Sequence, residues 1–401
     1  MLERFIGRLA GQRVALAVSG GGDSMAMLYL LAGRLDLSVV TVDHGLRPEA
    51  ADEARMVGQV AQSLGLTHHT LHWNAPAGGN LMDQARRARI GLMGEWARAQ
   101  GIGHIAMAHT ADDELETFIM RLARASGLQG LSGMRHAWCE AGVMWHRPML
   151  DLGRGALRDY LRNRGGHWAD DPSNDNPKYE RVRIRKAAPQ LAALGLTPEV
   201  ISASVAHLAR AEEALSQALV GMVARHVTVD RGDVLVSLDG LETELQGEFR
   251  RRLWAVILGW INGGEYAPRG TKLEAFCHDI GQTRTLAGVR RSHDGDFIRF
   301  TRELASVQAL VVQGGEVWDR WRLRGSQDGI GLQGLSIGAL GEAGLALCSD
   351  WRETGLPRAS LMASPAVWAG ETLVAAPLAG LPNGWIAEIA VPFAPSMLFT
   401  R

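Results

Sequence analysis

A short stretch near the start of the chain, residues 18–25 with the sequence VSGGGDSM, places three consecutive glycines between two apolar segments. Three glycines allow a tight turn because no Cβ atom stands in the way. If a helix follows the turn, its first N–H groups and its dipole form a site for an anion, and this geometry suits phosphate. The stretch lacks the ending of a Walker A loop, and it does not fit the dinucleotide fingerprint G-x-G-x-x-G.

The polar residues of this loop could also bind a ligand. The hydroxyls of Ser19 and Ser24 can donate to phosphate oxygens, whereas Asp23 would repel a phosphate unless a cation compensates it. A magnesium ion that bridges Asp23 and a pyrophosphate would resolve this conflict. A plain glycine-rich turn in which Asp23 or Ser24 caps the helix is the alternative interpretation. The predicted nucleotide-binding residues are Ser19, Gly20, Gly21, Gly22, Asp23 and Ser24, with Asp23 also as the metal ligand.

A second candidate, Asp43, comes directly after an apolar run at 37–42 that is typical of a buried strand. In a doubly wound sheet the carboxyl ends of the strands line the ligand crevice, so Asp43 and His44 would lie beside the nucleotide. The alternative is a strand-end turn in which Asp43 caps the next helix.

Acidic residues also gather after a later apolar run at 104–109. Because the helix dipole favours negative charge in the first turn, the cluster predicts a stabilised helix N-terminus. It suits a cationic partner equally well, either magnesium or an amine. The candidate residues here are His109, Asp112, Asp113 and Glu116.

An arginine-rich segment at 151–190 is polar and rich in turn-forming residues, with DDPSNDNPKY at its centre. It is either a solvated surface loop or a source of cations. In the second case its arginines would contact RNA phosphates or stabilise charge during phosphoryl displacement. The candidates in and before this segment are Arg147, Arg181, Arg183, Arg185 and Lys186.

Strand and helix patterns alternate along the first part of the chain. The predicted strands are 13–18, 37–42, 67–73 and 104–109, and the predicted helices are 24–33, 50–65, 81–100 and 111–125. This alternation predicts an α/β fold with a doubly wound parallel sheet. Because the pattern turns helical from about 194 and becomes glycine-rich with short strands from about 315, we predict three domains. These are an α/β catalytic domain at 1–190, a mainly helical domain at 191–310 and a small β-rich domain at 311–401.

The composition limits the class of protein. The chain has 401 residues, of which 46% are apolar and 21% charged, as in ordinary globular proteins. The net charge of −1 gives no support by itself for nucleic-acid binding. We expect a cytoplasmic protein, since no apolar run reaches the length of a membrane span and no signal peptide is evident. The three cysteines are far apart and form no CxxC motif, which argues against a zinc ribbon, an iron–sulfur cluster or a redox pair.

The loop SGGGDS resembles the SGGxDS pyrophosphate loop of the N-type ATP pyrophosphatases. Further motifs follow in order: DHGLR at 43–47, an H-x-x-DD-x-x-ET pattern from His109, GLSGM at 130–134 and the D-x-SN segment that leads to the arginines. Together, over roughly residues 13–190, they are similar to the motifs of the tRNA(Ile)-lysidine synthase family. Val182 departs from the family pattern, which usually has Asn between the first two arginines of that segment.

This resemblance implies an enzyme that joins free lysine to C2 of the wobble cytidine of a CAU-anticodon isoleucine tRNA. The cytosine C2 oxygen would attack the α-phosphate of ATP, pyrophosphate would leave onto the glycine loop and magnesium, and the lysine amine would displace AMP. Asp43 would activate or orient the amine. The resemblance also implies that His109, Asp112, Asp113 and Glu116 hold lysine or magnesium, that Arg183 or Arg185 faces the developing charge, and that Arg147, Arg181 and Lys186 bind the tRNA.

Three alternatives follow from the same residues. A tRNA 2-thiolation enzyme has a similar ATP loop but generally uses cysteines, and none of the three lies near the loop in sequence. A small-molecule amide synthetase would normally carry a glutaminase domain or a second set of motifs, neither of which is evident. A catalytically silent nucleotide- or RNA-binding module remains the third.

Overall fold

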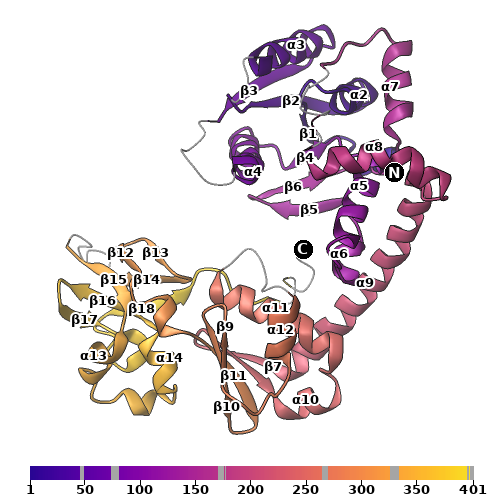
Figure 1. Cartoon of the computed structure of the whole chain (residues 1–401). Coiled ribbons are helices and arrows are strands. Elements are labelled where there is room, and N and C mark those ends of the chain that lie inside the picture. Colours follow the sequence, from indigo (N-terminus) through magenta and orange to yellow (C-terminus); the bar gives the residue numbers. More distant parts are fainter. Residues whose placement is uncertain are drawn as a thin grey trace. The chain divides into compact units, whose positions relative to one another are not determined.

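The structure is a computed structural model that describes residues 1–45, 49–73, 81–169, 176, 178–263, 270–325, 334–394 and 397. The chain forms two compact units, Met1–Glu212 and Glu213–Arg401. Figure 1 shows the first unit with its sheet and surrounding helices in indigo to magenta. The three-domain division expected from the sequence remains a prediction.

Strands and helices alternate along the first unit, as the sequence pattern predicts. Its elements are α1 (Leu2–Leu9), β1 (Arg13–Ala17), α2 (Gly22–Leu31), β2 (Asp36–Asp43), α3 (Glu49–Ser63), β3 (Thr67–His72), α4 (Leu81–Ala99), β4 (His104–Met107), α5 (Ala111–Leu122), α6 (Leu128–Leu131), β5 (Ala137–Glu140), β6 (Val143–His146), α7 (Arg154–Asn163), α8 (Glu180–Ala193) and α9 (Pro198–His226), the last of which continues into the second unit.

The strands of the first unit form one sheet in the order β3-β2-β1-β4-β6-β5. All neighbours run parallel except the edge pair β5 and β6, which is antiparallel. The predicted α/β fold with a parallel sheet is therefore confirmed. β1 and β2 are direct neighbours, so the loop that follows β1 and the residue that ends β2 lie at the same edge of the sheet.

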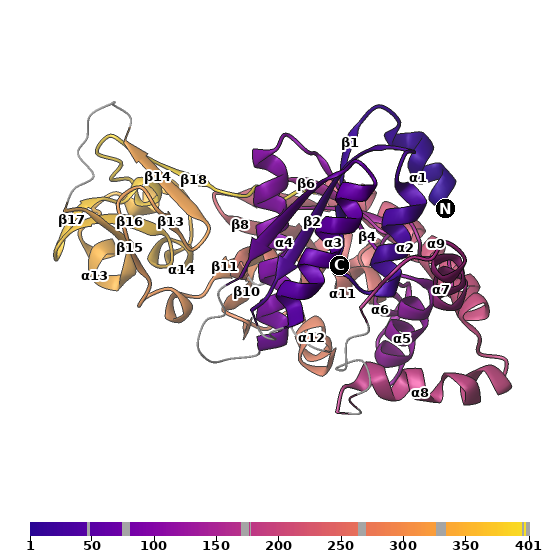
Figure 2. The same ribbon diagram turned by 90° about the horizontal axis from the view of Figure 1, so that it is seen from above.

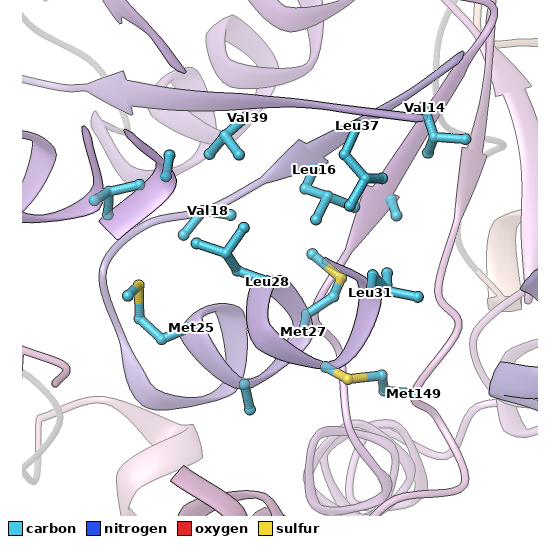
Figure 3. Packing of buried hydrophobic residues seen from close by; sticks show 14 of the residues in the cluster. Val14, Leu16, Val18, Met25, Met27, Leu28, Leu31, Leu37, Val39 and Met149 are labelled. Carbon is cyan, nitrogen blue, oxygen red and sulfur yellow. The ribbon is translucent and has the colours of Figure 1, made fainter. Parts of the chain in front are cut away.

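Helix α2 is fixed firmly against the sheet. Figure 3 shows Met27, Leu28 and Leu31 of α2 beside Leu16 of β1 and Val39 of β2, and all five side chains are fully buried. Each buried side chain of this size contributes about 1.5–3 kcal/mol to folding. This packing holds the N-terminus of α2 in place at the end of β1.

The segment 151–190 contains two helices that the prediction of a turn-rich region did not include. Helix α7 is anchored by Leu157 and Leu161, which lie one turn apart and are both buried in the core of the first unit. Helix α8 packs against α5, and the two lie together in Figures 1 and 2. The motif residues 170–175, like Leu46 and Arg47 of DHGLR, lie outside the described residues.

The second unit combines helices with short antiparallel strands. Its strands form sheets of order β7-β8-β11-β10-β9, β12-β15-β16-β17 and β13-β14-β18. The first of these sheets lies within the region expected to be mainly helical. No single described helix is long and apolar enough to cross a membrane, and the pair α8 and α9, which meets the length and composition criteria jointly, is bent by 95°.

The elements of the second unit are β7 (Val227–Asp230), β8 (Asp233–Ser237), α10 (Leu238–Thr243), α11 (Gly247–Asn262), α12 (Gly270–Cys277), β9 (Arg284–Leu286), β10 (Val289–Asp294), β11 (Phe297–Arg302), η2 (Leu304–Ser306), β12 (Val311–Gln313), β13 (Val317–Trp318), β14 (Trp321–Gly325), β15 (Ser336–Ala339), α13 (Gly341–Ala346), η3 (Trp351–Thr354), α14 (Arg358–Met362), β16 (Pro365–Ala369), β17 (Thr372–Ala375), η4 (Pro377–Ala379) and β18 (Trp385–Ile389).

Candidate active site

The glycine loop between β1 and α2 is closed by its own serines. The hydroxyl of Ser24 donates to the carbonyl of Gly21 over 2.9 Å and accepts from the backbone N–H of Ser19 over 3.2 Å. Gly20 has φ +88°, a conformation that side chains rarely adopt. Gly21 precedes α2 without a side-chain cap, so the first N–H groups of the helix remain available to an anion.

The far side of the loop is held by the chain that follows α7. The backbone N–H of Ala169 donates to the carbonyl of Gly20 over 2.9 Å, and Ala169 forms a parallel bridge with Gly21. The indole of Trp168 lies close to Gly22, with Cδ1 3.6 Å from the position of an added Cβ. The loop is therefore held between α2 and residues 168–169.

The carboxylate of Asp23 pairs with Arg154, a residue of α7. Arg154 donates from Nε to Oδ2 of Asp23 over 3.1 Å. The other oxygen, Oδ1, is buried and accepts no hydrogen bond from the described part of the chain. Burial raises the pKa of Asp23, and the charge of Arg154 opposes that rise.

Arg154 connects the glycine loop to the start of α5. Its guanidinium lies 3.3 Å from Oδ1 of Asp113 and 3.3 Å from Oε1 of Glu116, and its backbone N–H donates to Oδ2 of Asp112 over 2.6 Å. Burial alone would lower the pKa of Arg154, but the surrounding carboxylates raise it well above its ordinary value. The cation that the acidic cluster holds in this structure is thus an arginine of the chain itself.

Asp113 also caps α5, as the alternative interpretation of the acidic cluster predicts. Its Oδ2 accepts from the backbone N–H of Thr110 over 2.9 Å, and the Thr110 hydroxyl accepts from the Asp113 N–H, which completes a capping box. Burial would raise the pKa of Asp113, but Arg154 and neighbouring donors hold it below its usual value. The cluster therefore both stabilises the helix start and binds a cation.

Glu116 is the most deeply buried acid of the site, with a side chain only 2% exposed. Arg185 of α8 donates from Nε to Oε1 over 3.0 Å, and Nε of Arg181 lies 3.9 Å from Oε2. Because residues four apart share one helix face, Arg181 and Arg185 both face α5. Arg183 and Lys186 are exposed instead, and Arg183 donates to the carbonyl of Lys178 over 3.1 Å. Of the two predicted catalytic arginines, only Arg185 belongs to the described cluster.

His109 and Arg147 form a buried pair behind this cluster. Nε of Arg147 donates to Nδ1 of His109 over 3.2 Å. Burial, with added repulsion from Arg147, lowers the pKa of His109 to about 3, so this imidazole is neutral near pH 7. Arg147 is 8% exposed, donates to the carbonyl of Arg135 and lies 3.9 Å above the ring of Trp138. These contacts show that Arg147 has partners within the chain, and its predicted contact with the tRNA stays a prediction.

Asp43 ends β2 at the edge of the sheet that carries the glycine loop. Its Oδ1 accepts from the N–H of Gly45 over 2.9 Å, and Nδ1 of His72 lies 3.7 Å from its Oδ2. The Asp43 side chain is 13% exposed, so it is mostly shielded from solvent. Asp43 therefore lies at the carboxyl end of β2, next to the carboxyl end of β1, and its place in a ligand crevice stays a prediction.

The GLSGM motif packs against α5 at Glu114. Glu114 accepts from the backbone N–H of Met134 over 3.0 Å. Gly133 has φ +77°, and an added Cβ would lie 2.4 Å from Oε1 of Glu114 and 2.3 Å from Cγ1 of Val205. Only glycine fits here, so the motif has a structural role that its residue types did not indicate. Val182, the departure from the family pattern, is buried in α8.

The described residues contain no group of three His, Cys, Asp or Glu side chains that could hold a metal ion by itself. Magnesium, however, is often bound by one or two carboxylates together with the phosphates of a substrate. The buried Oδ1 of Asp23, which accepts no hydrogen bond within the described chain, fits a ligand of that kind.

Two residues of α7, Arg154 and Arg158, lie at the glycine loop, where Arg154 pairs with Asp23 and Nε of Arg158 is 3.8 Å from the position of an added Cβ on Gly22, whereas the sequence suggests both only as members of a basic stripe for RNA. Both lie in the segment that was predicted to be polar and turn-rich. Their spacing of four, with buried leucines at 157 and 161, is the signal that could have identified a helix face directed at the loop.

Comparisons with known proteins agree with this geometry. Residues 1–191 match a family model described as a PP-loop domain. A tRNA(Ile)-lysidine synthase from Ruegeria pomeroyi is 47% identical over 94% of this chain and 91% of its own length. Proteins of the same name from a Bradyrhizobium species and from Zymomonas mobilis are 42% and 36% identical over 72% and 75% of this chain, and over 84% and 91% of their own lengths. The chain uses ATP through its PP-loop domain and belongs to the tRNA(Ile)-lysidine synthase family.

Proposed function

We propose that the chain joins free lysine to C2 of the wobble cytidine of the CAU-anticodon isoleucine tRNA, with ATP converted to AMP and pyrophosphate. The observation that carries the proposal is the Arg154 cluster: Arg154 with Asp23, Asp113 and Glu116. It connects a phosphate-binding loop directly to a set of carboxylates suited to an amine substrate. Family membership supports the same reaction.

The first step forms an adenylated tRNA. The cytosine C2 oxygen attacks the α-phosphorus of ATP, and the bond between the α-phosphorus and the bridging oxygen breaks. The N–H groups at the start of α2 and the hydroxyl of Ser19 would receive the leaving pyrophosphate. Asp23 would hold a magnesium ion through Oδ1, which would neutralise phosphate charge when bound.

The second step forms the new C–N bond. The lysine ε-amine attacks C2, and the bond between C2 and the oxygen carrying AMP breaks. Lysine enters as an ammonium, so a base must remove a proton before attack. Asp43 is our candidate for that base or for orienting the amine. Asp112 is the second carboxylate for the amine, because Arg154 and Arg185 already compensate Asp113 and Glu116.

Positive charge near the reacting phosphate would come from Arg185, since developing charge is best stabilised by groups fixed in advance. Its two hydrogen bonds to Glu116 hold the guanidinium beside the middle of α5. Arg181 and the exposed Lys186 are candidates for tRNA phosphate contacts.

The thiolation alternative gains no support from the position of the cysteines. Cys139 lies on the edge strand β5, which is separated from β1 by β4 and β6 in the sheet. The other two cysteines belong to the second unit.

The decisive experiment mixes the purified protein with ATP, magnesium, radiolabelled lysine and a CAU-anticodon isoleucine tRNA transcript. We expect acid-precipitable label that requires ATP and is absent when the wobble C is replaced by U. An Asp43→Asn variant should make adenylated tRNA but incorporate lysine slowly. ATP cleavage to AMP and pyrophosphate without label would reject the assignment of lysine.

A further inference from the structure

Helix α7 directs two arginines toward the glycine loop. Arg154 and Arg158 lie one turn apart and therefore share a face of the helix. Leu157 and Leu161 anchor α7 in the same core as α2, and the two helices pack against each other. Arg154 reaches Asp23, the second residue of α2. Arg158 therefore faces the N-terminal end of α2 as well.

Arg158 lies beside the first residue of α2. Its Nε is 3.8 Å from the position that a Cβ on Gly22 would occupy, and this nitrogen is shielded from solvent. The charge of Arg158 also acts on Asp23, where it opposes the rise in pKa that burial causes. The guanidinium is thus close to the helix N-terminus where an anion would bind.

The charges at the loop indicate that a bound anion would need a further cation. The loop offers an anion neutral donors, namely N–H groups and serine hydroxyls, but it also contains the negative Asp23. The charge of Arg154 is shared among Asp23, Asp113 and Glu116. Even with a magnesium ion on Asp23, a pyrophosphate keeps net negative charge, so a further cation would stabilise it. A guanidinium suits this role because its planar N–H groups can contact two phosphate oxygens at once.

We propose that Arg158 binds the pyrophosphate group that ATP releases, as a direct contact of the loop that completes its cradle from α7. This inference rests on the proposed function for the identity of the anion. It assigns to Arg158 a binding role that is separate from the amine step, since Arg158 lies beside Gly22 of the glycine loop whereas Arg154 contacts the α5 carboxylates.

Pyrophosphate binding by the full chain tests the inference directly. Calorimetry with magnesium pyrophosphate, without tRNA or lysine, would compare the natural chain with Arg158→Gln and Arg158→Lys. We expect Arg158→Gln to weaken binding about 10-fold and Arg158→Lys to weaken it less, because lysine keeps the charge but loses the planar fork. Binding of AMP, which lacks the β- and γ-phosphates, should change less than twofold in both variants.

Arg162→Gln is the matched control on the same helix. Its guanidinium is 60% exposed and pairs with Asp159, so pyrophosphate binding should stay unchanged. Equal pyrophosphate affinity in the natural chain and a folded Arg158→Gln variant would overturn the inference. So would failure of the natural chain to bind pyrophosphate at all. A chain that binds pyrophosphate through Arg158 but makes no lysidine would leave this inference intact and reject the proposed function instead.

Discussion

Each compact unit contains an arginine held by three carboxylates, and the two clusters differ in how closed they are. In the first unit, the Arg154 cluster lies at the edge of the sheet, and Asp23 keeps one buried oxygen without a hydrogen bond in the described chain. In the second unit, Arg299 pairs with Asp230, Asp233 and Asp294. We call this second group the Arg299 cluster.

The Arg299 cluster is closed by the chain around it. Oδ2 of Asp233 accepts from Arg299 over 2.9 Å and from the hydroxyl of Ser360 over 2.5 Å. Asp233 and Ser360 lie 127 positions apart in the sequence, so the cluster joins distant parts of the second unit. Similar charge sets therefore serve different purposes: one leaves an acceptor for a ligand, whereas the other uses its acceptors to hold the fold.

The largest effect should come from Arg299→Met, because three aspartates lose this cation and only Asp230 of the three has a second ion pair in the described chain, with Arg231. Removing one partner of a buried charge network typically costs about 3–5 kcal/mol. Urea unfolding should show a loss of that size in the free energy of unfolding. Variant protein that remains folded should bind pyrophosphate like the natural chain. A loss below about 1 kcal/mol would contradict a structural role for the Arg299 cluster.

The glycine loop and its strands could be predicted from the sequence because their signals are local. An apolar run, a glycine turn and a second apolar run specify β1, the loop and α2 without reference to distant residues. The acidic start of α5 could also be predicted from the sequence, both as a stabilised helix N-terminus and as a cation-binding cluster. What the sequence could not show is that the cation for these acids would come from residue 154.

The reason is that Arg154 reaches the site only through tertiary packing. Helix α7 has few apolar residues, so its composition resembled a polar loop, and two buried leucines decide its position. Arg147 illustrates the opposite case, since an arginine is usually exposed but here lies buried over Trp138. Charged side chains whose partners are more than 30 residues away have no local pattern by which to recognise them.

Arg154→Gln should separate activity from stability. Without Arg154, Asp23 loses the cation that opposes the rise in its pKa, and the link between the loop and α5 is broken. We expect lysidine formation to fall about 100-fold, the equivalent of about 2.7 kcal/mol, as for the loss of strong charge-assisted bonds. Stability should fall by less than about 2 kcal/mol, because Asp113 keeps its cap and Glu116 keeps Arg185.

Initial rates and urea unfolding on the same preparations measure both quantities, with Arg162→Gln as the control for an exposed arginine of α7. If Arg154→Gln loses as much stability as Arg299→Met, both clusters mainly stabilise the fold, and the distinction between them is wrong. If its rate is unchanged, the Arg154 cluster is not part of the active site.

The smallest effect concerns the pH dependence of stability. Burial raises the pKa of Asp233 from 3.8 to about 6, although Ser360 and Arg299 oppose the rise. A raised pKa means that the folded chain binds a proton more tightly than the unfolded chain, so this residue stabilises the fold most at low pH. Its contribution should decline as the pH rises from about 4 to about 6, by at most about 3 kcal/mol, the free energy equivalent of the full shift.

The measurement is the difference in free energy of unfolding between the natural chain and Asp233→Asn at several pH values, because other titrating groups cancel in that difference. Relative to the variant, the natural chain should lose stability across the window from about 4 to 6 and change little above it. A difference that grows in favour of the natural chain over that window would mean that Arg299 dominates and that Asp233 titrates below its ordinary value. The Arg299 cluster would then depend on ion pairing at every pH above 4, and burial of Asp233 would no longer explain how the cluster responds to pH.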